Sequence, residues 1–484
     1  MKALVMGLGL HGGGLASAGF LLKRGAEVTV TDLRDEKTLT PSIEELDASC
    51  RELGCRPVRY VLGKHEIDDF KNADMVVKNP GVKPDSPFLL ASKRIETDLS
   101  LFLQESPSRL FAVTGSKGKS GTSSALHWVL ARGRKAGKAF LGGNITVSPL
   151  TFLDELTKDD DVVLELSSFQ LGDIKNRFKP DGSPLLKPSA AILTAIMADH
   201  LDRYATMEEY IDDKRNIYRG QDESCVTIAG DDAWGKSFLS ETKGRPIIRS
   251  RGHDLCSALS ETQSGGWIDE SGAGFARLLS GEVTELVPQH LLVPGEHQKL
   301  NLLSAALAAY SLGAGAETIR EALSAYTGIE HRIELFHEAN GLRGKPNCKI
   351  RFYNDSAATI PEAAAACVEA LNACSGQGGL ILVTGGTDKN LDFTPLANAA
   401  KHAKAVILLA GTGSEKLAGL LGEAGTPYSG PFDDIDKAVN CSIEKASSGD
   451  IVALSPGCAS FGMFLNEFDR GRKWKEAVLK EVVE

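Results

Sequence analysis

The stretch from Phe111 to Leu130 constrains the fold of this chain more than any other, because an apolar run passes through a glycine-rich turn into a helical pattern. In such a turn consecutive backbone N–H groups converge on an anion, and the following helix directs its positive end at the same point. Lys119 would contact the outer phosphates of a nucleotide, and Ser120 would ligate Mg²⁺. The stretch therefore predicts an α/β domain that binds a nucleotide triphosphate.

The turn itself reads Thr114-Gly-Ser-Lys-Gly-Lys-Ser120 and is shorter than the general pattern GxxxxGK[ST], whose first glycine would fall at Val113. An ordinary surface loop rich in Gly, Ser and Lys is the alternative interpretation. The residues expected to bind ATP in this loop are Gly115, Ser116, Lys117, Gly118, Lys119, Ser120 and Gly121.

A chain of 484 residues is too long for one core and should divide into about three domains of roughly 150 residues. We expect boundaries at 1–98, 99–326 and 327–484. The net charge of −10 argues against nucleic acid as a partner, since proteins that bind its phosphates usually present a basic face.

The nine cysteines form no CxxC pair and no metal-finger spacing, so we expect reduced thiols. The N-terminus lacks the pattern of a signal peptide, and no apolar run approaches the ~18 residues that would span a bilayer. These observations predict a cytoplasmic protein without a membrane partner.

The first residues predict a βαβ unit, with strands at 3–6 and 27–32 and a helix at about 14–24. The intervening turn, 7–12, matches GxGxxG, and an acid follows twenty residues later, as in dinucleotide-binding folds. The turn could therefore bind NAD, or it could hold a uridine diphosphate, or it could be unused. In the second case the contacts would come from Leu10, His11, Asp32 and Arg34, together with Gly81 after a strand at 74–78.

Two further strands of the central region end in polar residues. The strand that starts at Asp161 delivers Glu165, an oxygen ligand suited to Mg²⁺, and the strand at 190–197 leads to His200. A helix at 210–218 would place Lys214 on one face with two tyrosines. Taken alone, each has a plainer interpretation: a solvated acid, a structural histidine and a snorkelling lysine. Asn301, at the start of an alanine-rich helix, could reach a nucleotide base.

The last third of the chain repeats strand, loop and helix, with strands at 350–356, 379–384, 405–409 and 451–454. Such alternation predicts a mostly parallel sheet covered on both faces. We therefore expect three α/β domains: a Rossmann-like N-terminal domain, a central phosphate-loop domain and a Rossmann-like C-terminal domain.

Several motifs occur together, in order and over nearly the whole chain: TGSKGKS (114–120), ELSSFQL (165–171), DHLDRY (199–204), YIDDKRNIY (210–218), GEHQKLN (295–301), EHRIE (330–334), YNDSAAT (353–359), GGTDK (385–389) and LSPGCASF (454–461). This set resembles the Mur ligases of peptidoglycan synthesis. The resemblance implies an ATP-dependent ligase that activates the carboxylate of UDP-N-acetylmuramoyl-L-alanine as an acyl phosphate and couples it to D-glutamate.

The resemblance also implies roles for particular residues. Two Mg²⁺ ions would be held by Ser120, Glu165, His200 and a carbamylated Lys214, with Lys119 as a further catalytic group. Asn144 would touch the muramoyl substrate. In the third domain Arg332 and Asp355 would contact ATP. The glutamate would be held by Thr359, Lys389, Ser460 and Phe461, where a helix beginning near Ser460 would offer N–H groups to the carboxylate.

The chain also departs from the family pattern. Ala357 stands where a lysine is expected and Glu467 where an aromatic residue is expected; the other departures are Asn79, Lys117 and Gln298. Because the changes gather around the amino-acid site, L-glutamate or another amino acid is an alternative substrate. A folylpolyglutamate-type ligase, an NAD-dependent oxidoreductase and a nucleotide-binding scaffold without chemistry are further alternatives. We expect a monomer.

Overall fold

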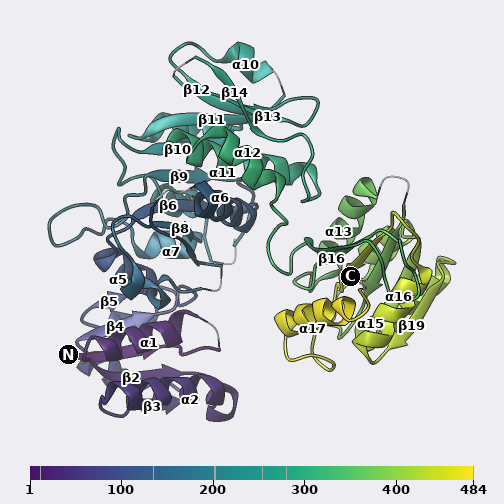
Figure 1. The fold of residues 1–484 in the computed structure, drawn as a ribbon. Coiled ribbons are helices and arrows are strands. Elements are labelled where there is room, and N and C mark those ends of the chain that lie inside the picture. Colours follow the sequence, from purple (N-terminus) through teal and green to yellow (C-terminus); the bar gives the residue numbers. More distant parts are fainter. Residues whose placement is uncertain are drawn as a thin grey trace. The chain divides into compact units, whose positions relative to one another are not determined.

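The computed structural model describes residues 1–10, 12–133, 136–145, 147–200, 203–252, 254–279, 281–375 and 378–482. The chain divides into two compact units (Figure 1). Unit 1 comprises Met1–Gln289 and Lys299–Leu323, and unit 2 comprises His290–Gln298 and Ser324–Glu484. Unit 1 contains two sheets and unit 2 contains one, so the mixed α/β architecture expected from the sequence is confirmed.

The N-terminal sheet of unit 1 is parallel throughout, with the strand order β3-β2-β1-β4-β5. Its central strand β1 is apolar and buried after its first residue, as expected for a parallel strand covered on both faces. The strands are β1 (Lys2–Met6), β2 (Glu27–Asp32), β3 (Arg59–Leu62), β4 (Met75–Lys78) and β5 (Ile95–Glu96), and the helices are α1 (Gly13–Lys23), α2 (Glu36–Leu53), α3 (Ile67–Asn72), α4 (Pro87–Leu90) and α5 (Asp98–Glu105).

The second sheet of unit 1 has nine strands in the order β14-β13-β12-β11-β10-β9-β6-β8-β7. The strands from β7 to β12 are parallel, and β13 and β14 add an antiparallel edge. The strands are β6 (Arg109–Thr114), β7 (Ala139–Gly143), β8 (Asp161–Glu165), β9 (Ala190–Leu193), β10 (Val226–Gly230), β11 (Arg245–Arg251), β12 (Ser264–Ile268), β13 (Gly274–Arg277) and β14 (Val283–Val287).

Helices cover both faces of this second sheet. They are α6 (Lys119–Gly133), α7 (Ser168–Asp173), α8 (Met207–Arg215), α9 (Ala233–Glu241), α10 (Asp254–Ala258), α11 (Glu296–Ser311) and α12 (Ala316–Ser324), and two short 3₁₀ helices lie at Pro149–Thr151 and Leu153–Glu155. One hydrophobic core, which includes Val5, Leu99, Phe152 and Leu164, runs from the N-terminal sheet into the central sheet. The two sheets therefore form one compact unit.

Unit 2 holds a six-stranded sheet with the order β15-β16-β20-β17-β18-β19, parallel except for β15. Separate apolar clusters fill its two faces, which accounts for the full burial of its inner strands β17 and β20. The strands are β15 (Glu334–Ala339), β16 (Ile350–Asn354), β17 (Leu380–Thr384), β18 (Ala405–Leu409), β19 (Tyr428–Phe432) and β20 (Ile451–Leu454), and the helices are α13 (Pro361–Cys374), α14 (Thr394–Ala400), α15 (Thr412–Glu423), α16 (Ile435–Lys445) and α17 (Glu467–Leu479).

Three expected helices differ from the observed ones. Helix α8 ends at Arg215, so Tyr218 is not on it, as the 210–218 prediction required. The alanine-rich helix begins at Glu296, before Asn301. The expectation of a helix beginning near Ser460 is wrong, because α17 begins at Glu467, after an Asn466 cap.

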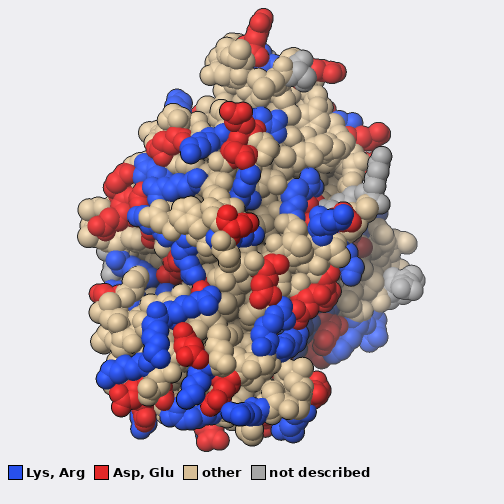
Figure 2. Space-filling model, turned by 90° about the vertical axis from the view of Figure 1, so that its left-hand side faces the viewer, with Lys and Arg blue, Asp and Glu red and all other residues tan. Residues whose placement is uncertain are grey.

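The surface carries both signs of charge. Figure 2 shows Asp and Glu side chains interspersed among Lys and Arg on the face it presents. Within the described ranges, no helix has the length and apolar character needed to cross a membrane.

Candidate active site

The predicted phosphate loop connects β6 to α6 at the carboxyl edge of the central sheet. Gly115 has φ +148° and Gly118 has φ +91°, values that side chains rarely tolerate. A Cβ atom on Gly115 would lie 1.9 Å from the Thr194 hydroxyl oxygen, and one on Gly118 would lie 2.5 Å from Asn301 Oδ1. Both glycines are therefore required by close packing, and Asn301 lies directly against the loop.

The end of β9 holds the loop in place. The Ser116 N–H donates to the Ala195 carbonyl at 2.8 Å, and the Thr194 hydroxyl donates to the Lys117 carbonyl at 2.6 Å. The Ser116 hydroxyl lies 2.8 Å from the Tyr210 hydroxyl. The loop is thereby fixed before any ligand arrives, which lowers the conformational cost of binding an anion.

Lys119 is half-buried, and its ammonium lies over the loop. Its Nζ donates to the carbonyl oxygens of Gly115, at 3.0 Å, and of Ser116, at 3.3 Å. Ser120 is the next residue, in the first turn of α6, and it is also half-buried. The cation is thus placed at the N-terminus of α6, where the helix dipole also favours negative charge.

Lys214 reaches the same carbonyl from α8. Its side chain is 1% exposed, its Nζ donates to Gly115 O at 3.1 Å, and it lies 4.5 Å from the centroid of the Tyr210 ring. Burial, together with the nearby charge of Lys119, lowers the pKa of Lys214 to about 7. The amine is therefore neutral in a large fraction of molecules near neutral pH.

Glu165 ends β8 and is 2% exposed. Its Oε1 accepts a hydrogen bond from Asn144 Nδ2 at 3.1 Å. Its Oε2 is buried and has no hydrogen-bond partner in the described part of the chain. A buried carboxylate oxygen without a partner is costly, and a cation would satisfy it. The chemistry of this side chain therefore fits a divalent metal ion.

His200 follows β9 with φ +55°, a left-handed conformation that is uncommon for a non-glycine residue. Its ring centroid lies 4.9 Å from that of Phe169 and 6.3 Å from that of Tyr210, and its side chain is 46% exposed. The structure thus brings Lys119 and Lys214 together and places His200 one aromatic ring away from Lys214. Among the residues that the structure describes, no three His, Cys, Asp or Glu side chains form a metal-binding cluster.

The predicted uridine diphosphate contacts lie around the loop after β1. The Asp32 carboxylate accepts the N–H of Gly9 at 3.1 Å and the N–H of Arg34 at 2.9 Å, so it shapes this loop. Leu10 is 40% exposed, and the Gly81 carbonyl accepts from Arg203 at 3.1 Å. His11 lies outside the described residues.

In unit 2, Asp355 follows β16 and is buried. Its carboxylate accepts the Ile333 N–H at 3.1 Å and the Ser455 hydroxyl at 2.7 Å. Desolvation raises the pKa of Asp355 to about 6, although these hydrogen bonds and the neighbouring Arg332 oppose the shift. Arg332 itself is exposed, between two residues with positive φ, His331 and Ile333. Its loop is therefore held in a strained conformation.

The residues predicted to hold glutamate also lie in unit 2. Ser460 is 4% exposed, whereas Phe461 is 62% exposed. Thr359 is half-buried and Lys389 is exposed. Ser460 lies in a loop rather than at a helix N-terminus, so the helix contribution predicted for carboxylate binding is absent at this described position.

Two residues shape the site in ways that the sequence interpretation did not predict: Thr194 was missed, and Asn79 was noted only as a departure from the family pattern. Thr194 buttresses the phosphate loop, and Asn79 donates from Nδ2 to the Gly7 carbonyl at 3.0 Å. Each follows directly on, or lies just beyond, a buried strand at its carboxyl end. Their position after a strand could have been used to predict them, because residues at the carboxyl ends of parallel strands lie at the sheet edge where ligands bind.

Three family descriptions match this chain. "Mur ligase MurD-like, N-terminal domain" matches residues 1–99, "Mur ligase middle domain" matches 113–309, and "Mur ligase, glutamate ligase domain" matches 331–458. Together with a geometry built around one phosphate loop, these matches define the class of protein: the chain belongs to the Mur ligase family.

Three relatives within that family share one name. A UDP-N-acetylmuramoylalanine--D-glutamate ligase from Treponema pallidum is 39% identical, over 98% of this chain and 96% of the relative. Ligases of the same name from Borreliella burgdorferi and Roseiflexus sp. are each 37% identical, over 99% of this chain and 97% and 98% of the relatives.

Solved structures are similar in fold. The UDP-N-acetylmuramate-alanine ligase MurC from Thermotoga maritima has a TM-score of 0.56 at 19% identity, over 99% of both chains. MurF from Acinetobacter baumannii has a TM-score of 0.56 at 14% identity, over 99% of this chain and 93% of that one. At these identities the likeness shows the shared architecture of the family.

Proposed function

We propose that this chain joins D-glutamate to UDP-N-acetylmuramoyl-L-alanine at the expense of ATP, in peptidoglycan synthesis. The names of its near-full-length relatives support this reaction. The structural observation that carries it is the position of Lys119, whose ammonium lies over the phosphate loop at the carbonyls of Gly115 and Ser116, because phosphoryl transfer needs positive charge at a preorganised loop.

The reaction has two steps. A carboxylate oxygen of the substrate attacks the γ-phosphorus of ATP, the bond to ADP breaks, and an acyl phosphate forms. The amino group of glutamate then attacks the acyl carbon, the amide bond forms, and inorganic phosphate leaves while the amine loses a proton. Both steps concentrate negative charge at the phosphoryl group.

The phosphate loop and its lysine would carry that charge. Apart from the Ser116 N–H, which donates to the Ala195 carbonyl, the N–H groups of residues 115–121 and the N-terminus of α6 would bind the phosphates. Lys119 would turn from the loop carbonyls toward the γ-phosphate. Mg²⁺, when bound, would neutralise phosphate oxygens. Glu165 would ligate one such ion through its Oε2, which has no hydrogen-bond partner among the described residues, and Ser120 would ligate the same ion. His200 and Lys214 would ligate a second ion.

Lys214 would serve as a carbamate. Its neutral amine attacks carbon dioxide, a nitrogen–carbon bond forms, and a proton is released, so that a cation becomes an anion. The lowered pKa of Lys214, about 7, favours the neutral amine that this step requires. The carbamate would also remove the repulsion between two ammonium groups that share one carbonyl.

The remaining assignments follow the family pattern. We propose that Asn301, Arg332 and Asp355 contact ATP. The loop after β1, with Leu10, His11, Asp32 and Arg34, would bind the uridine nucleotide together with Gly81, and Asn144 would contact the muramoyl group. Glutamate would be held by Thr359, Lys389, Ser460 and Phe461. A cytoplasmic location and a monomeric state stay predictions.

L-Glutamate is the second candidate amino acid. Ala357 and Glu467 replace a lysine and an aromatic residue expected near the amino-acid site. Glu467 opens α17, and its backbone carbonyl accepts the Ser356 hydroxyl at 2.7 Å, next to Ala357. Ala357 and Glu467 are therefore close together in unit 2. We propose that a site altered at these two positions could accept the other enantiomer of glutamate.

Isotope transfer tests the proposed chemistry. UDP-N-acetylmuramoyl-L-alanine labelled with heavy oxygen in its carboxylate is incubated with ATP and D-glutamate, and the released phosphate is analysed by mass spectrometry. The acyl-phosphate route transfers one heavy oxygen to phosphate for each amide formed. If the released phosphate carried no heavy oxygen and the label were found only in the amide product, the acyl-phosphate route would be wrong.

A further inference from the structure

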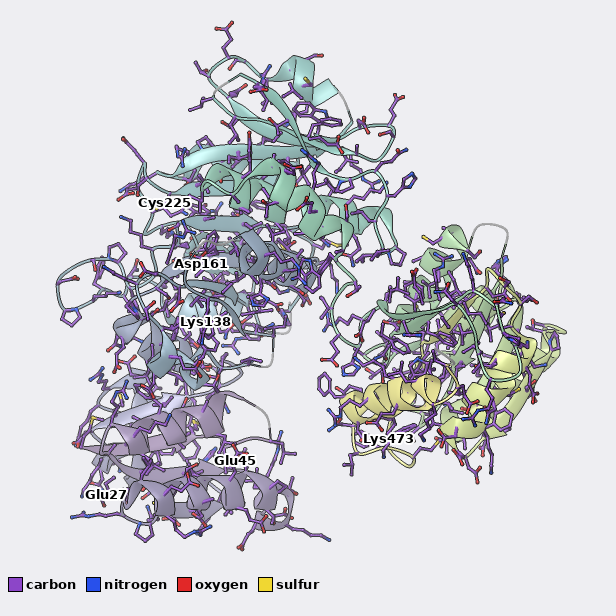
Figure 3. The ribbon with its side chains drawn as sticks, viewed as in Figure 1. Glu27, Glu45, Lys138, Asp161, Cys225 and Lys473 are labelled. Atoms are coloured by element: carbon purple, nitrogen blue, oxygen red, sulfur yellow. The ribbon has the colours of Figure 1, made fainter. Side chains whose placement is uncertain are left out.

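A cavity of about 580 Å³ lies in unit 1, at the outer part of the central sheet. Val226, Arg245 and Ser264 line it, and they are the first residues of β10, β11 and β12. Figure 3 labels Cys225, directly before β10, and also Lys138 and Asp161 at the same end of β7 and β8. The cavity therefore opens at the amino ends of these parallel strands.

The phosphate loop lies at the opposite edge, after the carboxyl end of β6. Helix α11 spans the two places: Asn301 lies against Gly118, and Ser311 at the other end lines the cavity. Ten residues of helix separate them by about 15 Å along the axis. The cavity is thus distinct from the proposed nucleotide site.

The walls of the cavity are mainly apolar, with Leu239 from α9, Ile247 and Ile248 from β11 and Leu278 after β13. Two cations, Lys236 and Arg245, are part of the lining, and no Asp or Glu is among its described residues. Neither cationic side chain has an ion pair or hydrogen bond within the described portion of the chain, and both are exposed. The site combines apolar volume with uncompensated positive charge.

We propose that this cavity binds a single-chain amphiphile with an anionic head, of the class of a medium-chain fatty acid. The alkyl chain would cover the leucine and isoleucine side chains, and the carboxylate would pair with Lys236 and Arg245. The volume lies within the range of small-molecule sites, roughly 300–1,000 Å³. The two cations select an acid over a neutral lipid.

Fluorescence titration of the full chain with dansyl-labelled undecanoic acid tests the proposal. Dansyl emission should rise and shift to the blue with wild-type protein, and ATP or a uridine nucleotide should not displace the probe. The double variant Lys236→Glu/Arg245→Glu should bind at least about tenfold more weakly, since two charge-assisted contacts are lost. Ser240→Trp, which places a large side chain at the lining, should also block the probe.

The control Lys243→Glu changes the same charge on the exposed loop after α9, outside the cavity lining. It should leave the affinity unchanged. Displacement by ATP would place the probe in the nucleotide site and overturn the proposal. Equal weakening by Lys243→Glu, or equal affinity for the neutral dansyl-labelled undecanol, would overturn the assignment of the two cations.

Discussion

At the scale of single residues, the Gly115 carbonyl is the most informative atom of unit 1, because two lysine side chains donate to it. Two ammonium groups at one acceptor repel each other, and the more buried one loses its proton more readily. Lys214 is that residue. We therefore propose a division of roles, in which Lys119 binds phosphate and Lys214 is available for modification.

Replacing Lys214 tests this division. Lys214→Ala should lose most of the ligase activity, and acetate or formate should restore part of it by supplying a carboxylate in the vacated space. In wild type under limiting carbon dioxide, activity should increase as the pH rises through about 7, since only the neutral amine is carbamylated. Full activity of the variant, or a free amine in mass analysis of the carbon-dioxide-equilibrated protein, would contradict the carbamate.

Lys119→Ala should lower the rate of phosphate release by about a thousandfold or more, because one preorganised charge at a transferring phosphoryl group is worth several kcal/mol. Lys117→Ala is the matched control, since the Lys117 side chain is exposed and only its backbone is proposed to contact phosphate. It should keep most of the activity. Similar rates for the two variants would refute the loop assignment.

Asp355 predicts a pH dependence of stability. Its folded pKa, about 6, lies above its ordinary value of 3.8, so the folded state binds the proton more tightly. Unit 2 should therefore lose stability as the pH rises from about 4 to about 6, and Asp355→Asn should remove that loss. Urea unfolding followed over this pH range measures it, and an unchanged profile in the variant would show that another group is responsible.

The sequence identified most of these residues but not their arrangement. Motif spacing predicted Lys119, Glu165 and Lys214, because each lies just after a strand or on a patterned helix. It could not show that Lys119 and Lys214 share one acceptor, since they are far apart in the chain. Tyr218 was wrongly placed on the same helix as Lys214, because helical spacing alone does not reveal that α8 ends at Arg215.

At the scale of elements, a buried ion pair connects the two sheets of unit 1. Lys78, which ends β4, donates to Asp173 of α7 at 2.6 Å, and the two side chains are 4% and 7% exposed. Burial lowers the pKa of Lys78 and raises that of Asp173, so the surroundings disfavour either charge alone. Each charge therefore depends on the other.

Lys78→Met should lower the free energy of unfolding of unit 1 by about 3–5 kcal/mol, because a buried carboxylate is left without its partner. The exposed pair Lys187–Asp222 supplies the control, and Lys187→Met should cost less than about 1 kcal/mol. The double variant Lys78→Met/Asp173→Leu should recover much of the loss. Urea unfolding of all three provides the comparison, and a single Lys78 variant as stable as the control would contradict the role of the pair.

Strands were predicted better than helix ends. The apolar runs at 3–6, 161–165 and 451–454 are buried parallel strands. A short continuous apolar run is typical of such strands, because both of their faces are covered. The loop before α17 was mistaken for a helix start, because the Asn466 cap and the helix that follows it lie six residues beyond Ser460. Such boundaries are set by polar capping residues, which the hydrophobic periodicity of a sequence does not reveal.

At the scale of the whole molecule, two compact units divide the proposed residues. Unit 1 carries the phosphate loop, Glu165 and Lys214, and unit 2 carries Arg332, Asp355 and the predicted glutamate contacts. The two units together account for a reaction with three substrates. The NAD-binding alternative for the N-terminal turn loses support, because residues 1–99 match the N-terminal domain of Mur ligases.

Phosphate release with UDP-N-acetylmuramoyl-L-alanine, ATP and a panel of D- and L-amino acids is the measurement that tests the proposed ligase reaction. We expect release that requires all three substrates, with D-glutamate preferred over L-glutamate, and a product heavier than the muramoyl substrate by one glutamyl residue. Preference for L-glutamate would contradict the assignment of the enantiomer. Absence of release with every amino acid, by protein that binds both nucleotides, would contradict the ligase function itself.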